Sequence, residues 1–327
     1  MAYPKTAWVL TDGKAGDELQ CLGVAEALNI KPDIRRIAPK HPYDWLAPWG
    51  PVDPAEYPDQ PDSPLRGPYP DLVIASGRRA IPALRFIKTL LGDRVFTVCL
   101  KDPRTGPNTA DLIWVPEHDR LAGPNVIRTL TSPHRLRLTD LQAARIEPPR
   151  ALLALPHPRV GVLVGGNSRN HIFTDEDIAR FVAGLEKLTQ QGAALIATLS
   201  RRSPKALADA VQGCIAVSGG YLWDGKGVNP YHAILALSDQ FVVTADSVNM
   251  ISEACITGRP IQVFEPSRRF FGNAAKINRF ISGLIAAGAV QNFQGTLESY
   301  AYKPLDSTPV IAEAIKLAFA NRSSALL

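Results

Sequence analysis

The chain has few cysteines, no long apolar run and no large excess of charge of either sign. Its four cysteines are far apart, each in an apolar segment, which argues against a CxxC metal site and a disulfide framework. No stretch approaches the roughly 18 apolar residues that a membrane-spanning helix needs, and no signal-peptide pattern precedes the first strand-like segment. We therefore expect a cytoplasmic protein, or one peripheral to the inner face of a membrane, without a transmembrane segment.

The net charge of +5 is modest and spread along the chain, which suits a phosphate-bearing ligand or an anionic lipid surface. No basic helix or recognised nucleic-acid-binding module occurs, so we do not expect nucleic-acid binding. A hydrophobic content of 46% and a charged content of 20% are those of a soluble globular protein, and 327 residues suffice for two domains.

The nucleotide-binding signatures GxGxxG and the P-loop are also missing, which argues against a dehydrogenase. The first strand, from Thr6 to Asp12, runs instead into the loop GKAGDE and a helix from about Asp17 to Leu28. A strand, a glycine-containing loop and a helix start form an anion-friendly turn, to which Lys14 adds a positive charge.

Strands alternate with helices along the rest of the chain, which is typical of parallel sheets covered on both faces. Strand-like segments lie at 71–77, 94–100, 111–115, 125–130, 159–166, 193–200, 214–218, 241–244 and 261–264, with helices from 78, 174, 203 and 247. We predict an α/β protein of two doubly wound Rossmann-like domains that face each other across a cleft. The domains span residues 1–150 and 151–305, a proline-rich linker lies at 147–158, and a C-terminal helix in 306–327 packs back on the first domain.

The stretch from Asp239 to Phe264 is the most informative one. Ser247 is a good N-cap for its helix and Gly258 a good left-handed stop after it. The spacing of Asp246 and Glu253 places them on the polar side of the helix, where the amino end suits a phosphate and a carboxylate two turns later suits a ribose. The alternative is that Asp246 only caps the helix and Glu253 is solvated.

Two further loops follow neighbouring strands of the second half and, with this one, predict a diphosphate site. Glycines in GGNSR (165–169) allow close approach of backbone amides to an anion, and two arginines in SRRS (200–203) provide planar donors for phosphate. The predicted nucleotide-binding residues are Gly165, Gly166, Asn167, Ser168, Ser200, Arg201, Arg202, Thr244, Asp246, Ser247, Asn249 and Glu253.

Candidate catalytic and acceptor groups lie at strand ends of the first half. His118, beside Asp119, is a candidate general base because imidazole titrates near neutral pH, although a loop histidine is more often structural. The predicted catalytic residues are His118, Asp119 and Lys14, and the predicted acceptor-binding residues are Asp12, Gly13, Gly16 and Arg78. The DED run at 175–177 fits the first turn of a helix capped by Thr174, so we predict no metal site and no cofactor.

Residues 39–70 are rich in proline and cannot form a regular element, so we expect an extended excursion. The favoured interpretation is a loop whose aromatic residues pin it to the core. The alternative is that Trp45 and Trp49 contact a membrane or an amphiphilic substrate, because indoles prefer that boundary.

The chain resembles a known family over nearly its full length. The resemblance rests on the segments LTDGKAGDELQCLGVAEAL, ASGRR, DLIWVPEHD, VGVLVGGNSR, LSRRSP and NPYHAILALSDQFVVTADSVNMISEACITGRPIQVF. These are similar to the "elongated mitochondria" protein family of mitochondrial fission, whose bacterial members are described as nucleoside-diphosphate-sugar epimerases. The second half also resembles B-type two-domain glycosyltransferases, and this implies that Ser247 and Glu253 grip phosphate and ribose. Asp17 departs from that pattern, since it stands where a His is expected.

Our leading hypothesis is a metal-independent glycosyltransferase that binds a nucleoside diphosphate sugar in the second domain. It would transfer the sugar to an envelope or lipid-linked acceptor held by the first. One alternative is a nucleotide-sugar epimerase, which needs acid and base groups around the sugar. Another is a non-catalytic adaptor at a membrane surface, as the resemblance to the plant fission proteins implies.

Overall fold

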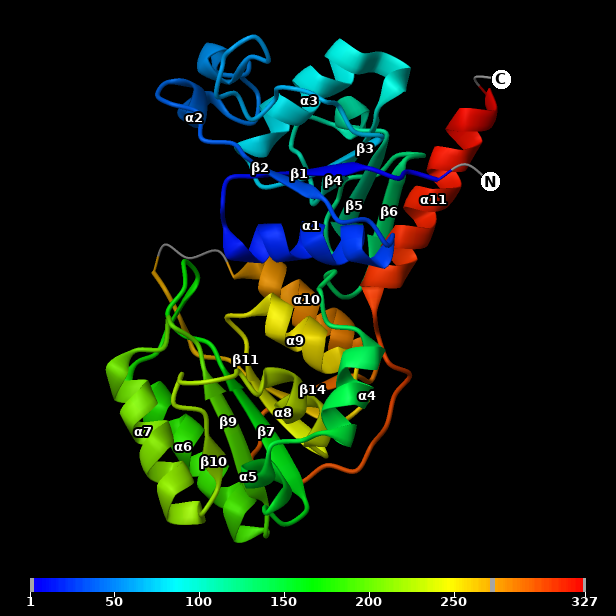
Figure 1. Ribbon diagram of the computed structural model, residues 1–327. Helices are drawn as coiled ribbons and strands as arrows, with labels where there is room; N and C mark the ends of the chain where they lie inside the picture. Colours follow the sequence, from blue (N-terminus) through cyan, green and yellow to red (C-terminus); the bar gives the residue numbers. More distant parts are fainter. Residues whose placement is uncertain (1–2, 271–273, 326–327) are drawn as a thin grey trace. The chain divides into compact units, whose positions relative to one another are not determined.

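The computed structural model describes residues 3–270 and 274–325, which divide into two compact units (Figure 1). The first unit comprises Met1–Arg135 and Asp306–Leu327, and the second comprises Leu136–Leu305. The boundary therefore falls at Arg135, ahead of the proline-rich segment 147–158, which lies inside the second unit. The reason is helix α4 (Leu138–Ile146), which packs on α8 (Tyr231–Leu237), and the Arg145 guanidinium donates to the Ala236 carbonyl at 3.0 Å.

The first unit is built on six parallel strands in the order β2-β1-β3-β4-β5-β6. The strands are β1 (Ala7–Thr11), β2 (Asp33–Arg36), β3 (Leu72–Ser76), β4 (Phe96–Leu100), β5 (Leu112–Pro116) and β6 (Val126–Thr129). The three strands β1, β3 and β4 are buried along their whole length, because helices or loops cover both faces of the sheet.

Helices α1 and α11 pack together on one face of this sheet, and α3 lies on the other (Figure 1). The helices are α1 (Ala15–Ala27), α2 (Tyr43–Leu46), α3 (Ala80–Leu91) and α11 (Ser307–Ala325), with short 3-10 turns η1 (Pro54–Glu56), η2 (Gly92–Arg94) and η3 (Pro107–Thr109). Ile311 and Ile315 of α11 are fully buried against α1 and the sheet, so the last helix completes the core of the first unit.

The proline-rich segment forms only the one-turn elements α2 and η1, as the proline content predicted. Tyr57 stacks on Phe86 at 5.3 Å and Tyr69 lies 5.6 Å from Trp8, so these two rings pin the segment to the core. The same interpretation is wrong for the two tryptophans of the segment. Trp45 is 73% exposed and Trp49 is 63% exposed.

The second unit repeats the architecture with a six-stranded parallel sheet in the order β10-β9-β7-β11-β12-β14. Its strands are β7 (Arg159–Val164), β9 (Ala194–Leu199), β10 (Tyr221–Leu222), β11 (Gln240–Thr244), β12 (Ile261–Phe264) and β14 (Val290–Asn292). A separate antiparallel ribbon pairs β8 (His171–Ile172) with β13 (Ser267–Arg268).

Helices α6 and α7 pack on one face of this sheet and form an apolar core with it. Helices α8 and α9 also contact strands of the sheet. The helices not yet bounded are α5 (Arg150–Leu153), α6 (Asp175–Gln190), α7 (Lys205–Ser218), α9 (Val248–Cys255) and α10 (Ala275–Ala286). The predicted caps are confirmed: Ser247 accepts from the Met250 amide at 3.4 Å, and Gly258 has φ of 68°.

The predicted strand at 214–218 is wrong, because these residues form the last turn of α7. Leu207, Val211 and Ile215 repeat at helical spacing and are buried, so the apolar run continues a helix face up to the left-handed Gly219. A short apolar run fits either a buried strand or a buried helix, and periodicity over five residues does not separate them.

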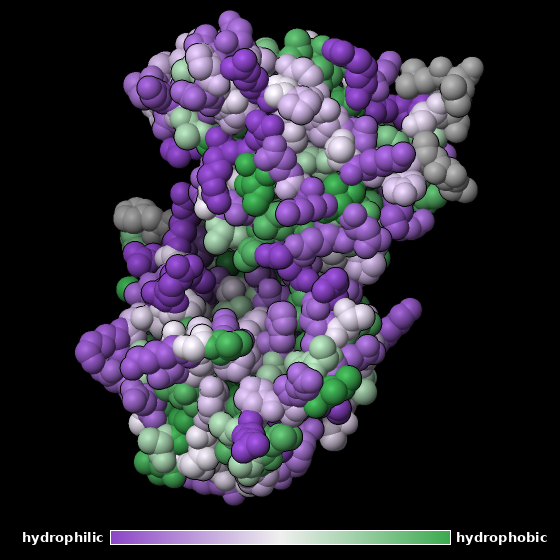
Figure 2. Space-filling model, viewed as in Figure 1, coloured by the Kyte–Doolittle hydropathy of each residue, from purple (hydrophilic) through white to green (hydrophobic). Residues whose placement is uncertain are grey.

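No helix within residues 3–270 and 274–325 is long and apolar enough to cross a membrane. Figure 2 shows hydrophilic residues interspersed with apolar ones over the visible face of each unit.

Candidate functional site

Three loops meet at the carboxyl edge of the second sheet, where β9, β7 and β11 are neighbours. They meet on the carboxylate of Asp246, whose side chain is fully buried. The Gly166 amide donates to this carboxylate at 2.9 Å, the Thr244 hydroxyl at 2.7 Å and the Arg202 guanidinium at 3.1 Å. Asp246 therefore locks the loop after each of the three strands in one arrangement.

The two glycines of the first loop are required by space. A Cβ on Gly165 would lie 2.2 Å from an Asp246 carboxylate oxygen, and one on Gly166 would lie 2.0 Å from the Arg202 carbonyl oxygen. The Gly165 amide donates to the Thr244 hydroxyl at 2.8 Å, so both glycine amides are used inside the protein. The expectation that these amides approach an anion is replaced by a structural role: they let three loops pack closely.

The other polar residues of these loops shape the same turn. Asn167 Oδ1 accepts from the Phe173 amide at 2.9 Å, Ser168 Oγ accepts from the His171 amide at 3.0 Å, and Ser200 Oγ accepts from the Arg202 amide at 2.9 Å. The side chains left for a ligand are therefore chiefly arginines. Arg169 and Arg201 are exposed, and neither forms an ion pair with any residue in the described part of the chain.

Glu253 lies on α9, two turns after its amino end, with Asn249 half-buried one turn earlier. Its carboxylate accepts a 2.5 Å hydrogen bond from the hydroxyl of Tyr231, the first residue of α8. Burial raises the pKa of Glu253 to about 7, against the lowering effect of that hydrogen bond. Burial and the adjacent carboxylate raise the pKa of Tyr231 well above its usual value. The expectation of a solvated Glu253 is thus excluded by its contacts.

Sequence reasoning missed three parts of this edge: Tyr231, Arg268 with Arg269, and His171. The β13 ribbon pairs Arg268 with His171, and the Arg269 amide donates to the Asn170 carbonyl at 2.9 Å, so two more arginines join the edge. A signal was present, because the triplet SRR at 200–202 recurs at 267–269, each time directly after a strand or its turn.

The DED run holds this ribbon and the start of α6. Asp177 accepts from the Thr174 hydroxyl at 2.9 Å, the Ser267 amide at 3.0 Å and the Arg180 guanidinium at 2.9 Å. Burial alone would raise the pKa of Asp177, but these hydrogen bonds outweigh it and lower the pKa to about 2. The predicted capping role is confirmed. Among residues 3–270 and 274–325, no group of three or more His, Cys, Asp or Glu side chains is placed to hold a metal ion.

His171 is fully buried, and within the described residues neither of its ring nitrogens has a hydrogen-bond partner. Burial lowers its pKa, so the imidazole is neutral near pH 7. Its backbone pairs with that of Arg268 in the antiparallel ribbon.

The carboxyl edge of the first sheet carries balanced charge. The Lys14 ammonium lies 2.6 Å from Asp12, and the Lys101 ammonium pairs with Asp17, which also accepts from the Ser76 hydroxyl at 3.4 Å. Gly13, at φ of 83°, forms the turn, and Gly16 lies in the first turn of α1.

The other predicted residues of the first unit are dispersed. His118 and Asp119 follow β5, where the Asp119 amide donates to the Pro116 carbonyl at 2.9 Å. β5 is three strand spacings from β1, roughly 14 Å, so Lys14 belongs to a different loop cluster. Arg78 does not face a strand-end cluster: its guanidinium donates to the carbonyls of Asp44, Trp45 and Ala47.

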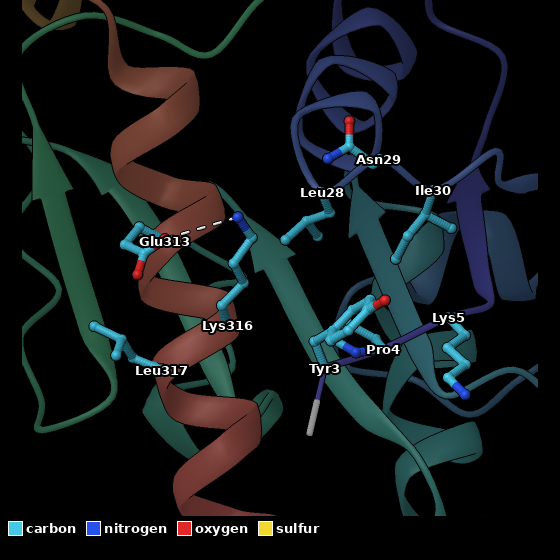
Figure 3. Close-up of a pocket in the computed structure, with 9 residues that line it drawn as sticks. All are labelled: Tyr3, Pro4, Lys5, Leu28, Asn29, Ile30, Glu313, Lys316 and Leu317. Atoms are coloured by element: carbon cyan, nitrogen blue, oxygen red, sulfur yellow. Dashed lines mark ion pairs between the residues drawn. The ribbon is translucent and has the colours of Figure 1, made fainter. Parts of the chain in front are cut away.

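A cavity of about 520 Å³ lies elsewhere in the first unit, between the amino-terminal segment, the end of α1 and α11 (Figure 3). Leu28, Ile30 and Leu317 line it, with Lys316 and Glu313 joined by an ion pair of 3.7 Å at its side. It lies at the amino-terminal ends of β1 and β2, so it is separate from both strand-end clusters.

Comparison with solved structures supports the fold. A UDP-GlcNAc 2-epimerase from Methanocaldococcus jannaschii has a TM-score of 0.53 at 12% identity, over 96% of this chain and 99% of that one. A UDP-N-acetylglucosamine 2-epimerase from Rickettsia bellii also has a TM-score of 0.53 at 12% identity, over 99% of this chain and 97% of that one. The predicted fold class, two doubly wound Rossmann-like units of the glycosyltransferase B-like kind, is confirmed.

Comparison with protein sequences gives the family. Residues 15–319 match the family described as Mitochondrial fission ELM1. The mitochondrial fission protein ELM1 of Arabidopsis thaliana is 31% identical over 286 residues, 79% of this chain and 66% of the plant protein, so the chain spans slightly less than two thirds of that relative. An uncharacterized protein of Rickettsia prowazekii is 24% identical over 286 residues, 76% of this chain and 80% of its own length. The chain belongs to the Mitochondrial fission ELM1 family, as its motifs predicted.

Proposed function

We propose that the second unit binds a nucleoside diphosphate sugar at the carboxyl edge of its sheet. The observation that carries this is a pair of exposed arginines, Arg169 and Arg201, which form no ion pair with any described residue and lie on loops that Asp246 locks in place. Guanidinium groups provide planar donors for phosphate, and the adjacent amino end of α9 adds the positive end of a helix dipole. A dianionic diphosphate complements this excess of positive charge.

Glu253 supports the nucleoside part of the proposal. Its carboxylate is half-buried and held by Tyr231, so its position is fixed before any ligand arrives. A fixed carboxylate accepts hydrogen bonds from two vicinal hydroxyls, as a ribose presents them. Asn249 and Ser247, on the turns before it, lie on the path from ribose to diphosphate.

The likeness to a known nucleotide-sugar protein is consistent with this assignment. The M. jannaschii UDP-GlcNAc 2-epimerase, with a TM-score of 0.52 in its complex with UDP-GlcNAc and UDP, shares the fold at 12% identity. The fold thus accommodates such a ligand in that protein, and the arginines and Glu253 supply the matching chemistry in this one.

For the reaction we propose transfer of the sugar to a hydroxyl of an envelope or lipid-linked acceptor, without a metal ion. The acceptor oxygen attacks the anomeric carbon, the bond from that carbon to the diphosphate oxygen breaks, and the hydroxyl proton passes to a base. Arg201, Arg202 and the α9 amides stabilise the departing diphosphate. His118 with Asp119 remains the proposed base, and Lys14 with the loop at Asp12, in a separate loop cluster, is proposed to bind a part of the acceptor distant from the reacting hydroxyl.

Calorimetry with UDP, GDP and UDP-sugars in the presence of EDTA tests the binding step. We expect Arg201→Gln to weaken binding about tenfold or more, because one charge-assisted phosphate contact is lost. Arg259→Gln is the matched control: it removes the same charge from an exposed arginine at the amino-terminal end of β12. Equal affinities for the two variants, or no binding of either nucleotide by the wild type, would contradict the proposal.

Epimerisation is the second candidate, favoured by the epimerases among the proteins of the same fold. NMR of a UDP-sugar incubated without an acceptor separates the two reactions, because only an epimerase converts the sugar under that condition. A non-catalytic adaptor is the third candidate, favoured by membership of a mitochondrial fission family. It predicts nucleotide binding without turnover, or no nucleotide binding.

A further inference from the structure

The short helix α2 and the turn after it are held on the first unit by three arginines. Arg78 donates to the carbonyls of Asp44, Trp45 and Ala47 at 2.9, 3.2 and 2.7 Å. Arg85 donates to the carbonyls of Pro48 and Trp49 at 3.4 and 3.3 Å, and Arg79 pairs with the Asp44 carboxylate at 3.2 Å. The last carbonyls of a helix lack partners within it, and here guanidinium groups from α3 and the turn before it satisfy them.

The same segment displays its apolar side chains to solvent. Ala47 and Val52 are buried and fix the segment to the core, whereas Trp45, Leu46 and Trp49 are 73%, 45% and 63% exposed. Many hydrogen bonds therefore hold in place a surface of two indoles and a leucine that contributes nothing to the core. Tyr57 and Tyr69 of the same excursion are less exposed, at 36% and 40%, and their rings lie against Phe86 and Trp8, whereas the two indoles are the most exposed rings of the segment.

A cavity of about 620 Å³ adjoins Trp49 within the first unit. Arg85 and Lys88 line it together with Thr89, Thr105 and Thr109, whose hydroxyls bond to one another or to backbone carbonyls. Lys88 and Arg322 share one carboxylate, that of Asp111, at 3.2 and 3.3 Å, so with Arg85 the surroundings of the cavity carry an excess of positive charge. The guanidinium of Arg85 and the ammonium of Lys88 give this cavity cationic donors that suit a phosphate group.

The margins of the exposed surface are also basic. Lys40, His41 and Arg104 are exposed around it, and the Trp49 indole nitrogen donates to the Arg104 carbonyl at 3.3 Å. The acidic Asp44 is neutralised by Arg79. Indole rings favour the boundary between lipid tails and headgroups, and cations near that boundary attract anionic headgroups.

We propose that Trp45, Leu46 and Trp49 insert into the interface of an anionic phospholipid bilayer, with a headgroup phosphate in the cavity between Arg85 and Lys88. This surface belongs to the first unit alone and is independent of the nucleotide proposed for the second. The segment anchors the protein at the membrane surface without a spanning helix.

Sedimentation of the whole protein with vesicles tests the proposal in the absence of nucleotide. We expect binding to phosphatidylcholine vesicles that contain phosphatidylserine, weaker binding to pure phosphatidylcholine, and release at high salt. The double variant Trp45→Ala, Trp49→Ala should bind about tenfold or more weakly, because it lacks the two indoles that the bilayer interface would bury. Lys88→Gln weakens it about fivefold and reduces the dependence on salt.

Two variants at the cavity of Figure 3 are matched controls on the same unit. Tyr3→Ala removes a 59% exposed aromatic ring, and Lys316→Gln removes the positive charge of a half-buried lysine that, like Lys88, pairs with a carboxylate. Both are expected to bind vesicles like the wild type. All four proteins are checked by circular dichroism for an unchanged thermal midpoint. The proposal is overturned if the wild type does not bind anionic vesicles, if the Tyr3 variant loses as much binding as the tryptophan variant, or if the tryptophan variant binds like the wild type. It is also overturned if this surface binds a protein partner and no vesicles.

Discussion

The two sheets end in edges of the same geometry but of different electrostatics. In the second unit the central carboxylate, Asp246, is fully buried and accepts from three loops. In the first unit Asp17, with 16% exposure of its side chain, pairs with Lys101, while the buried carboxylate of Asp12, 2% exposed, pairs with the exposed Lys14. Both lysines of the first edge are compensated, whereas Arg169 and Arg201 of the second edge form no ion pair within residues 3–270 and 274–325.

This difference is the basis on which we propose the second edge, and not the first, as the anion site. Using a buried carboxylate to hold the loops leaves the outer cations of the second unit available. Pairing each cation with its own carboxylate, as the first unit does, leaves little net field for a phosphate. The two parallel sheets thus differ in how the cations at their carboxyl edges are paired with carboxylates.

Removing Asp246 should produce the largest effect. Asp246→Ala leaves the Gly166 amide, the Thr244 hydroxyl and the Arg202 guanidinium without their shared acceptor, and we expect a loss of roughly 3 to 5 kcal/mol in unfolding free energy. Asp17→Ala, at a partly exposed pair, should cost about 1 kcal/mol or less. Urea unfolding measures both, with Trp223 reporting the second unit. Equal losses would remove the distinction between the two edges.

Glu253 should make the stability of the second unit depend on pH. Its pKa is raised to about 7 in the folded protein from 4.5, so the folded state binds more protons between these values and loses stability as pH rises through them. The wild type should lose about 3 kcal/mol over that window, and Glu253→Gln should not.

The matched variant in the first unit is Glu56→Gln. Burial also raises the pKa of Glu56, by a smaller amount, so its contribution has the same sign and a smaller size. Urea unfolding at pH 5 and pH 8 measures both variants. A wild-type stability that rises from pH 5 to pH 8, relative to Glu253→Gln, would contradict the assignment.

Local patterns in the sequence predicted the elements that local physics determines. The alternation of apolar segments and helices gave both sheets, and capping chemistry gave the helix starts at Thr174 and Ser247. The wrong prediction was at the end of α7, where the five residues 214–218 fit the apolar spacing of a strand as well as that of a helix. These successes and this failure share one cause, because periodicity reports only on neighbours in sequence.

Contacts between distant segments could not be predicted in the same way. Tyr231 and Glu253 are on different helices, and Arg268 meets His171 only through a ribbon that joins two separate loops. Gly165 and Gly166 were expected to bring backbone amides to an anion, whereas the structure shows that they are needed for space beside Asp246 and Arg202, which depends on the packing of three loops. Glycines in a loop sequence indicate that another group lies close to the backbone, but they do not identify that group.

Gly166→Ala should show that this packing, and not backbone freedom, makes the glycine necessary. The new Cβ would lie 2.0 and 2.2 Å from the Arg202 carbonyl oxygen and carbon, which are backbone atoms and cannot rotate away. We expect a loss of about 1 to 3 kcal/mol by urea unfolding. Gly213→Ala in α7 is the matched control, because a Cβ added there would meet no atom within 4 Å. It should stabilise the protein by up to about 1 kcal/mol. Because Gly166→Ala displaces the arginine loop while Gly213→Ala does not, only the former should also weaken UDP binding. Loss of stability with full UDP affinity would separate the loop packing from the proposed site.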